Sequence, residues 1–126
     1  MSNPLFALPE DHVEFDPKRF LPNVLFEAPE MKVVCATFRA GQFIPVHEPD
    51  VHVALFVLSG EGEVVAGKER RRVRKGDLVV VPRKVRRGVK AKTALGVLHV
   101  VSPAPAHADH GDMAGRIARG EFELPA

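Results

Sequence analysis

The sequence has one cysteine, no tryptophan and no tyrosine, and these absences exclude several classes of protein. With Cys35 alone, the chain can form no intramolecular disulfide and no zinc site built from several cysteines. Cys35 lies in the apolar run VVCATF, which favours a buried, unreactive thiol over a nucleophile. Asparagine, glutamine, serine and threonine are also scarce. Together with the many arginines and prolines, this composition is typical of a thermophilic source.

Long apolar runs are absent as well. No stretch approaches the roughly 20 residues that a membrane-spanning helix requires. The N-terminus, MSNPLFALPEDHVEF, carries acidic residues where a signal peptide carries basic ones. We therefore expect a cytoplasmic protein with no membrane partner.

What the sequence does contain indicates one all-β domain. The 126 residues, of which 45% are hydrophobic, suffice for a single core. Eleven prolines and ten glycines are spread along the chain, which favours many short strands and turns over a helical bundle. We expect an N-terminal arm over residues 1–30, a β-barrel over residues 31–103 and a tail with one short helix over residues 104–126.

The strongest strand signal lies in residues 41–60, GQFIPVHEPDVHVALFVLSG. His47 ends an extended segment, Glu48-Pro49-Asp50 interrupts it, and an apolar run over residues 53–58 leads to a turn at Gly60. Turn residues bound the other expected strands. The full set is residues 31–39, 43–47, 51–58, 61–65, 70–74, 78–81 and 95–101, and residues 85–92 are expected to form a strand or a loop.

Two segments carry more specific expectations. Residues 78–81, LVVV, read as a strand buried on both faces. Residues 1–30 contain five prolines, so we expect an irregular arm with only one or two short strands there.

The C-terminal tail is predicted to form a short helix over residues 109–119 that ends at Gly120. The segment HADHGDM within it has the spacing of metal ligands at His107, Asp109, His110 and Asp112. In a polar tail that follows two prolines, we favour adventitious metal binding over a functional site.

Charge is unevenly distributed, although the formal net charge is only +2. Residues 68–92 hold twelve basic and two acidic side chains, whereas residues 1–67 hold four basic and ten acidic ones. Such a basic segment can bind the phosphates of a nucleic acid. It contains no aromatic residue for base stacking, however, so we favour its pairing with the acidic half, within a monomer or across a dimer.

Two motifs in the β-rich part resemble those of the cupin family, whose fold is a small jelly-roll-like β-barrel. Gly41 precedes His47 with five residues between them, Gly60 follows His47 by thirteen positions, and GDLVVVP occupies residues 76–82. These spacings match the family motifs G-x5-H-x-H-x3-E-x6-G and G-x5-P-x-G-x2-H-x3-N. The resemblance covers about residues 31–103 and implies a single cupin-type barrel. It also implies a homodimer, because small members of the family commonly pair through their sheets.

The resemblance places the family's metal ligands on residues of other chemistry. In the first motif, the first histidine falls on His47, the second on Pro49 and the glutamate on Val53. In the second motif, the glycine falls on Lys84 and the histidine on Arg87. Proline and valine cannot ligate a metal through their side chains, and a protonated arginine would repel a cation. An inherited site of three histidines and one carboxylate is therefore excluded.

A second way to hold a metal would use His47, His52 and His99. His99 shares a strand face with Val97, which the resemblance turns inward, and a bulge after Pro49 would bring His52 to the same place. Three imidazoles with water would bind Zn, Ni, Cu, Fe or Mn. In the other interpretation, His52 faces solvent, His99 hydrogen-bonds a backbone carbonyl, and the pocket holds no metal.

Three classes of function remain open. The first is a small-molecule-binding protein whose barrel cavity, with Val53, Arg87 and Val97 as ligand-binding residues, holds the ligand with or without a divalent metal. The second is a cupin enzyme, such as a dioxygenase, isomerase or lyase acting on a small acid. Without a metal, His47 and His99 would form a general acid/base pair, and Arg87 would pair with the carboxylate or phosphate of an anionic substrate. Burial would lower the pKa values of the histidines and make one of them a usable base near neutral pH. The third is a regulatory or nucleic-acid-associated protein that uses the basic hairpin of residues 68–92.

Overall fold

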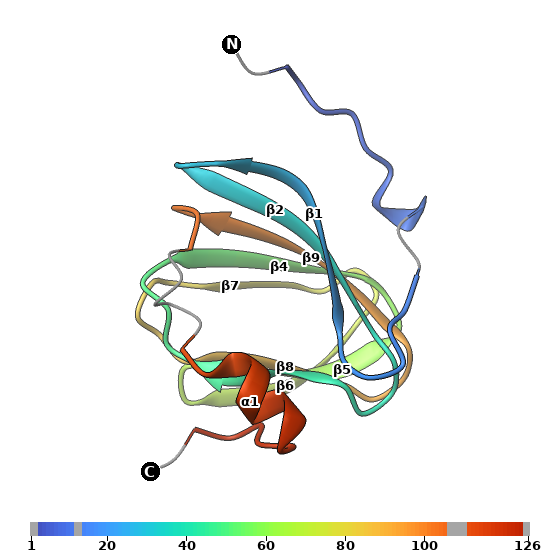
Figure 1. Ribbon diagram of the computed structural model, residues 1–126, viewed down its shortest axis with the longest axis vertical. Coiled ribbons are helices and arrows are strands. Elements are labelled where there is room, and N and C mark those ends of the chain that lie inside the picture. The colour runs from blue at the N-terminus through green and yellow to red at the C-terminus, as the bar shows by residue number, and fades with distance from the viewer. Residues whose placement is uncertain (1–2, 12–13, 106–110, 125–126) are drawn as a thin grey trace.

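The computed structural model describes residues 3–11, 14–105 and 111–124, and in this part of the chain two antiparallel β-sheets lie face to face (Figure 1). One sheet has the strand order β1-β2-β9-β4-β7, and the other has the order β3-β8-β5-β6. The elements are η1 (Pro9–Asp11), β1 (Leu21–Ala28), β2 (Met31–Phe38), β3 (Phe43–His47), β4 (His52–Ser59), β5 (Glu61–Ala66), β6 (Glu69–Arg74), β7 (Leu78–Val81), β8 (Arg87–Ala91), β9 (Leu95–Ser102) and α1 (Met113–Ala118). The predicted all-β barrel with a short C-terminal helix is confirmed.

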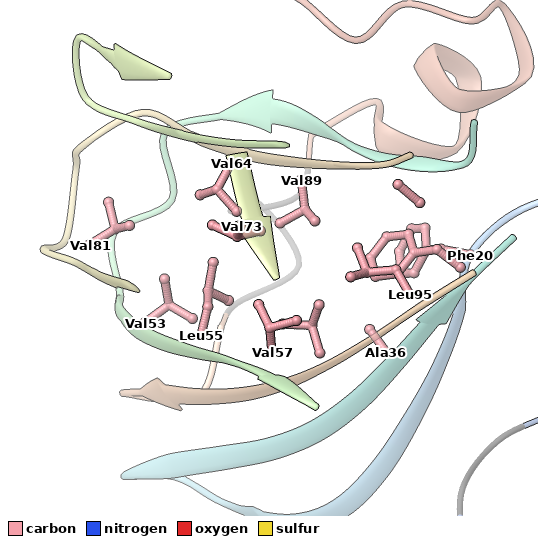
Figure 2. Close-up of a cluster of buried hydrophobic side chains, with 13 residues drawn as sticks. Phe20, Ala36, Val53, Leu55, Val57, Val64, Val73, Val81, Val89 and Leu95 are labelled. Carbon is pink, nitrogen blue, oxygen red and sulfur yellow. The ribbon is translucent and has the colours of Figure 1, made fainter. Parts of the chain in front are cut away.

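The core lies between the two sheets and is built by the period-2 alternation of the strands. On β4, Val53, Leu55 and Val57 are 3%, 2% and 0% exposed and point towards the facing sheet, as Figure 2 shows for this cluster. His52 and Phe56, which alternate with them, are exposed. The continuous apolar run of residues 53–58 thus forms a strand with only one buried face. Its outer face stays accessible.

Strand β7 corrects one prediction. Its position in the sequence is as expected, but Leu78 and Val80 are 64% and 63% exposed, so the strand is not buried on both faces. The reason is that no described residue covers the outer face of the sheet at β7, which pairs with β4 alone and forms one edge, whereas Val81 on the inner face is 1% exposed. An apolar surface strip therefore begins at this edge.

Strand β1 differs from the sequence expectation for the N-terminal arm. Instead of short interrupted strands, residues Leu21–Ala28 form one strand of eight residues that contains Pro22. Proline is tolerated there because β1 is the opposite edge of the five-stranded sheet and pairs with β2 alone. The preceding arm lies over β2, where the Thr37 hydroxyl donates to the Glu14 carbonyl oxygen at 2.5 Å.

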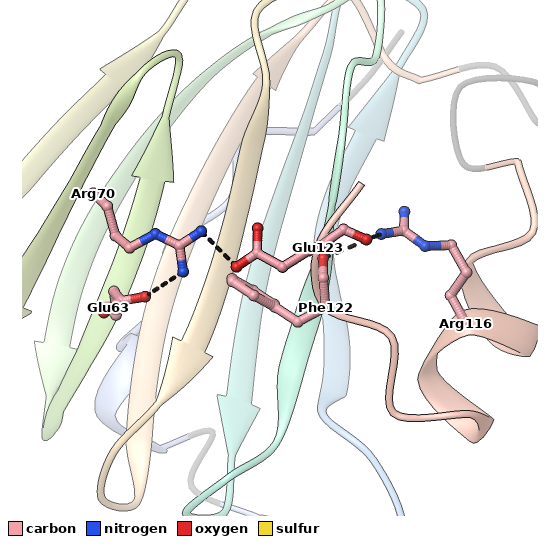
Figure 3. Close-up of polar contacts among 5 residues, drawn as sticks. All are labelled: Glu63, Arg70, Arg116, Phe122 and Glu123. Atoms are coloured by element: carbon pink, nitrogen blue, oxygen red, sulfur yellow. Dashed lines mark hydrogen bonds and ion pairs between the residues drawn. The ribbon is translucent and has the colours of Figure 1, made fainter. Parts of the chain in front are cut away.

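The C-terminal segment is held against the four-stranded sheet by one arginine. Arg116 on α1 donates to the carbonyl oxygens of Val46, Phe122 and Glu123 at 2.6, 3.1 and 2.9 Å. The Glu123 carboxylate in turn pairs with Arg70 on β6, which also bonds Glu63 (Figure 3). Phe122 is thereby kept 7% exposed against the outer face of this sheet.

Helix α1 covers only six residues, fewer than the predicted range, part of which lies outside the described residues. Asp112 occupies its N-cap position without a side-chain capping bond, and Gly120 follows its end with φ +71°. In the described part of the chain, no helix is long and apolar enough to span a membrane.

Candidate functional site

A cavity of about 410 Å³ opens between the two sheets. Most of its wall is aliphatic, and Val53, Leu55 and Val89, drawn in Figure 2, contribute to it. Five side chains with nitrogen groups interrupt this apolar wall: Arg19, Lys32, His47, Arg87 and His99. The arrangement, an apolar hollow with a few convergent polar groups, is typical of a small-molecule site.

Strand register brings three of these groups together from both sheets. His47 at the end of β3 is the direct cross-strand partner of Arg87 at the start of β8. His99 lies on β9, where it pairs with Val34 on one side and Leu55 on the other, and both of these neighbours line the cavity. The four-stranded sheet thus supplies one imidazole and one guanidinium, and the five-stranded sheet supplies the second imidazole.

Arg87 is a buried cation. Its exposed fraction is 6%, and its guanidinium donates from Nη2 to the Pro82 carbonyl oxygen at 2.7 Å and from Nε to the Val85 carbonyl oxygen at 3.4 Å. Nη1 is buried and finds no hydrogen-bond partner among the described residues. Burial lowers the pKa of Arg87, but an arginine stays protonated at neutral pH. The side chain therefore keeps a full positive charge beside the cavity.

His99 is neutral at physiological pH. Burial, together with the nearby His47 and Arg87, lowers the pKa of His99 from 6.5 to about 4, against the opposing effect of its contact with the Val97 carbonyl. Because that carbonyl only accepts hydrogen bonds, ring atom Nδ1, 3.3 Å away, carries the proton. Nε2 of the neutral ring is then a hydrogen-bond acceptor.

His47 has the same local arrangement. Its Nδ1 lies 2.8 Å from the Pro45 carbonyl oxygen, two residues earlier in β3. This contact fixes the ring and places the Nδ1 proton on the backbone side. The two imidazoles at the cavity are thus held by equivalent contacts from opposite sheets.

His52 does not join them, which corrects the predicted three-histidine set. Val51 and Val53 are both 3% exposed, so the alternation of the strand turns the intervening His52 to the outside. Its Nδ1 accepts a hydrogen bond from the Arg83 backbone N–H at 3.1 Å. Within residues 3–11, 14–105 and 111–124, no group of three histidine, cysteine, aspartate or glutamate side chains is placed to hold a metal.

The positions of the cupin metal ligands nonetheless all line the cavity. They are His47, Pro49, Val53 and Arg87 in this chain. Only His47 has a ligating side chain, and His99 adds one more imidazole, while the Arg87 charge opposes a cation. The described residues therefore do not fit the divalent metal of a cupin-type site.

Some of the other predicted site residues lie outside the cavity wall. Val97 is 1% exposed in the hydrophobic core and is not part of the cavity wall, whereas Val53 is in both. Asp112 pairs with Arg119 at 3.0 Å on the surface. The remaining members of the tail pattern, His107, Asp109 and His110, lie outside the described residues.

Sequence reasoning missed two cations at the cavity. Lys32 is on β2 in the same alternating row as Val34 and Ala36, so the period of this strand could have identified it. It also pairs with Glu27 at 3.7 Å. Arg19 precedes β1 in an irregular segment, where no periodic signal exists.

The basic segment of residues 68–92 pairs with acidic side chains of the first half of the chain. Arg70 on β6 pairs with Glu63 at 3.0 Å. Arg83, which follows β7, pairs with Asp50 at 2.7 Å. A third pair joins Arg86 to Glu48 at 2.9 Å. All these groups are about half exposed, so each pair adds little stability, but the pairing follows the intramolecular pattern that the charge distribution favours.

Comparison with known proteins agrees with this fold. The cupin domain family model matches residues 35–102. An RmlC-like cupin protein from Desulfovibrio desulfuricans is 34% identical, with a TM-score of 0.65 and coverage of 82% of this chain and 95% of that chain. No curated protein matches the sequence.

Two further solved structures share the fold at lower identity. The conserved SPY1581 protein of unknown function from Streptococcus pyogenes is 22% identical, with a TM-score of 0.71 and coverage of 84% and 93% of the two chains. KdgF from Halomonas is 24% identical, with a TM-score of 0.68 and coverage of 79% and 95%. The motif spacings, the barrel of two facing sheets and a family match over more than half of the sequence place this chain in the cupin family.

Proposed function

We propose that the protein binds a small organic molecule in the cavity between its two sheets. The observation that carries the proposal is the cavity itself, with a volume of about 410 Å³ and a largely aliphatic wall. Pockets of a few hundred cubic ångströms with a small number of convergent polar groups are the usual form of small-molecule sites. The polar groups in this one come from β2, β3, β8 and β9 and from the segment that precedes β1.

Binding is better supported than the two enzymatic alternatives. A metal-dependent reaction would need a ligand set that the described residues do not offer. Proton transfer would need a group with a pKa near the working pH, and the pKa of His99, at about 4, is lower than a general base at neutrality requires. The neutral His99 ring is suited to accept a hydrogen bond from a bound molecule.

A variant that blocks the mouth of the cavity tests the proposal. Ala114 on α1 is exposed and contributes to the cavity wall, so Ala114→Trp places a large side chain at the opening without disturbing the core. Ala118→Trp is the matched control, since Ala118 is exposed on the same helix but outside the wall. Small carboxylates, amides and alcohols are screened by ligand-observed NMR. Compounds that bind the wild type and the control but not Ala114→Trp support the proposal; equal binding to all three proteins, or to none, refutes it.

For the partner of this chain, the proposal is a second copy of itself. The outer face of the five-stranded sheet exposes Phe56, Leu78 and Val80 by 40%, 64% and 63%, and these residues come from the adjacent strands β4 and β7. The N-terminal arm, which extends away from the barrel in Figure 1, exposes Leu5 and Phe6 by 51% and 95%. Two apolar surfaces on one chain can cover each other in a symmetric pair.

A nucleic acid is a weaker candidate partner. Arg70, Arg83 and Arg86 of the basic segment already pair with acidic side chains of the same chain. These pairs use charges that phosphate contacts would require. Measurable affinity for DNA at low salt would reopen this possibility.

A further inference from the structure

Arg87 is a buried charge without a counter-ion in the described part of the chain. No carboxylate pairs with it among the described residues, its Nη1 atom has no hydrogen-bond partner, and its two other contacts are to neutral carbonyl oxygens. Burying an ion without an opposite charge is costly, and such charges are usually paired. The side chain is nevertheless only 6% exposed and lies in the wall of the cavity.

The described residues around the cavity supply no anion that could balance the Arg87 charge. Every polar side chain of the described cavity wall is that of an arginine, a lysine or a histidine, and no aspartate or glutamate belongs to this described wall. Glu27, the partner of Lys32, and Glu48, the partner of Arg86, both lie outside this wall. The described wall therefore contributes positive charge and no negative charge to the cavity, and the Arg87 charge also contributes to the lowered pKa of His99.

We propose that the ligand of this cavity is an organic monocarboxylate, whose carboxylate pairs with the Arg87 guanidinium while its apolar body lies against the aliphatic wall. This inference rests on the proposed function and specifies the ligand class. A guanidinium presents parallel N–H donors that match the two carboxylate oxygens. Nη1 of Arg87 is a donor that has no hydrogen-bond partner among the described residues.

The composition of the wall favours a carboxylate over a phosphate. Val34, Ile44, Val51, Leu55 and Val101 make most of the surface around the charged group, so a ligand must bury an apolar body as well as one charge. A phosphate dianion carries more charge and more acceptor oxygens than one buried guanidinium can satisfy. Inorganic phosphate therefore serves as the arm of the test that separates the two anions.

The test compares acid and amide forms of the same molecule. Cyclohexanecarboxylate and cyclohexanecarboxamide, and benzoate and benzamide, are titrated into the full-length protein by isothermal calorimetry, with inorganic phosphate as a third probe. The acids have the same bodies as the amides but add the charge. We expect the acids to bind at least about tenfold more tightly than the amides, and phosphate to bind more weakly than either acid.

Variants then assign the effect to Arg87. Arg87→Met removes the charge and keeps a similar apolar length, and Arg86→Met is the matched control because Arg86 pairs with Glu48 on the surface. The preference for acids should disappear in Arg87→Met and persist in Arg86→Met and Ala118→Trp. Because the acid and amide are also compared on the wild type, the inference stays testable even where Arg87→Met does not fold.

The outcomes separate this inference from the proposed function. If acids and amides bind equally and Ala114→Trp abolishes both, the cavity is a ligand site but its ligand is not chosen by charge, which overturns the inference alone. If the acids bind but neither Arg87→Met nor Ala114→Trp weakens them, they bind elsewhere, and the inference is overturned. If no probe binds, both the inference and the proposed function are overturned.

Discussion

Arg87 and His47 face each other across the β3–β8 ladder, as a directly paired couple at the cavity end of the four-stranded sheet. Both occupy positions at which the cupin motifs have metal-binding histidines, and both line the cavity. Exchange of the second of these histidines for arginine replaces a metal ligand with a fixed positive charge. At this position the barrel therefore presents a cation where the family motif has a metal ligand.

The first prediction concerns the stability of the protein without ligand. Arg87→Met removes a buried charge that has no carboxylate partner in the described structure, so no opposite charge is left stranded. Loss of the hydrogen bonds to the two carbonyl oxygens lowers the free energy of unfolding, whereas removal of the buried charge raises it. We expect the free energy of unfolding in urea to change by less than about 2 kcal/mol, below the roughly 3–5 kcal/mol that breaking a buried ion pair costs.

Arg116→Met is the matched comparison for this prediction. Arg116 is also a partly buried arginine, but its guanidinium donates to the carbonyl oxygens of Val46, Phe122 and Glu123 and holds the C-terminal segment in place. Arg116→Met should therefore lower the free energy of unfolding clearly more than Arg87→Met does. A greater destabilisation by Arg87→Met than by Arg116→Met would mean that the Arg87 charge has a stabilising partner after all.

The second prediction concerns the pH dependence of stability. Because the folded state holds the pKa of His99 at about 4, below the ordinary 6.5, the unfolded chain binds more protons between these values. Stability should therefore be unaffected by this group above pH 6.5 and fall as the pH drops from 6.5 to 4. The difference of about 2.5 pKa units corresponds to at most about 3 kcal/mol, and the access of water to the half-buried ring through the cavity reduces it.

His99→Leu isolates this contribution from the other histidines. Urea unfolding at several pH values between 4 and 7.5 should give a shallower loss of stability for the variant than for the wild type. After allowance for a constant offset, the two curves should coincide above pH 6.5 and separate progressively as the pH falls from 6.5 to 4. Parallel curves over the whole range would show that His99 titrates normally in the folded protein.

Much of this site was accessible from the sequence, because motif spacing fixes positions even where the residue types have changed. Glycine and proline spacing placed His47, Val53 and Arg87 at the cavity, and the structure has all of them in its wall. The same spacing put a motif glycine at Lys84, where the backbone still adopts φ +64°. The strand geometry of the family is thus present although three of its four ligand positions and one turn glycine are occupied by other residues.

What the sequence did not reveal depends on contacts between distant segments. The exposure of Leu78 arises because no described residue covers the outer face of the five-stranded sheet, which no local pattern records. Likewise, His52 was expected to reach the cavity through a bulge, whereas the alternation of buried Val51 and Val53 keeps it outside. Arg19 reaches the cavity from an irregular segment, without any periodic signal.

The third prediction concerns the oligomeric state. If the strip of Phe56, Leu78 and Val80 is covered by a second copy, Leu78→Asp places a charge in an apolar interface, and it does so twice in a two-fold symmetric pair. Burial of each leucine is worth roughly 1.5–3 kcal/mol, so the dissociation constant should rise at least about 100-fold. Sedimentation velocity over a range of concentrations measures it.

Val24→Asp is the control for the dimer prediction. Val24 is 47% exposed on β1, at the opposite edge of the sheet, and is the cross-strand partner of Val34, which faces the cavity. Val24→Asp should therefore leave the dimer intact. A monomeric wild type at high concentration, or equal weakening by both substitutions, would show that this strip is not the interface.

The fourth prediction concerns Gly60, the glycine that ends the first cupin motif at one corner of the barrel. Gly60 connects β4 to β5 and so carries the chain from one sheet to the other, beside the segment that leads from β8 back to β9. Its φ is +80°, and a Cβ atom built on it would lie 1.8 Å from the Ala94 carbonyl oxygen. Gly76, also at positive φ (+93°), has no atom within 4 Å of such a Cβ.

Gly60→Ala should therefore destabilise the protein through two effects, and Gly76→Ala through one. Both variants incur the strain of a side chain at positive φ, which costs roughly 1–2 kcal/mol, but only Gly60→Ala also forces two backbone segments apart, which adds roughly 1–3 kcal/mol or more. Urea unfolding of the two variants beside the wild type measures the difference. Because the clash is with backbone rather than a flexible side chain, rotamer changes cannot relieve it, and the corner must open. Equal destabilisation by both alanines would mean that the two sheets do not approach each other at Gly60 and Ala94 as closely as this corner requires.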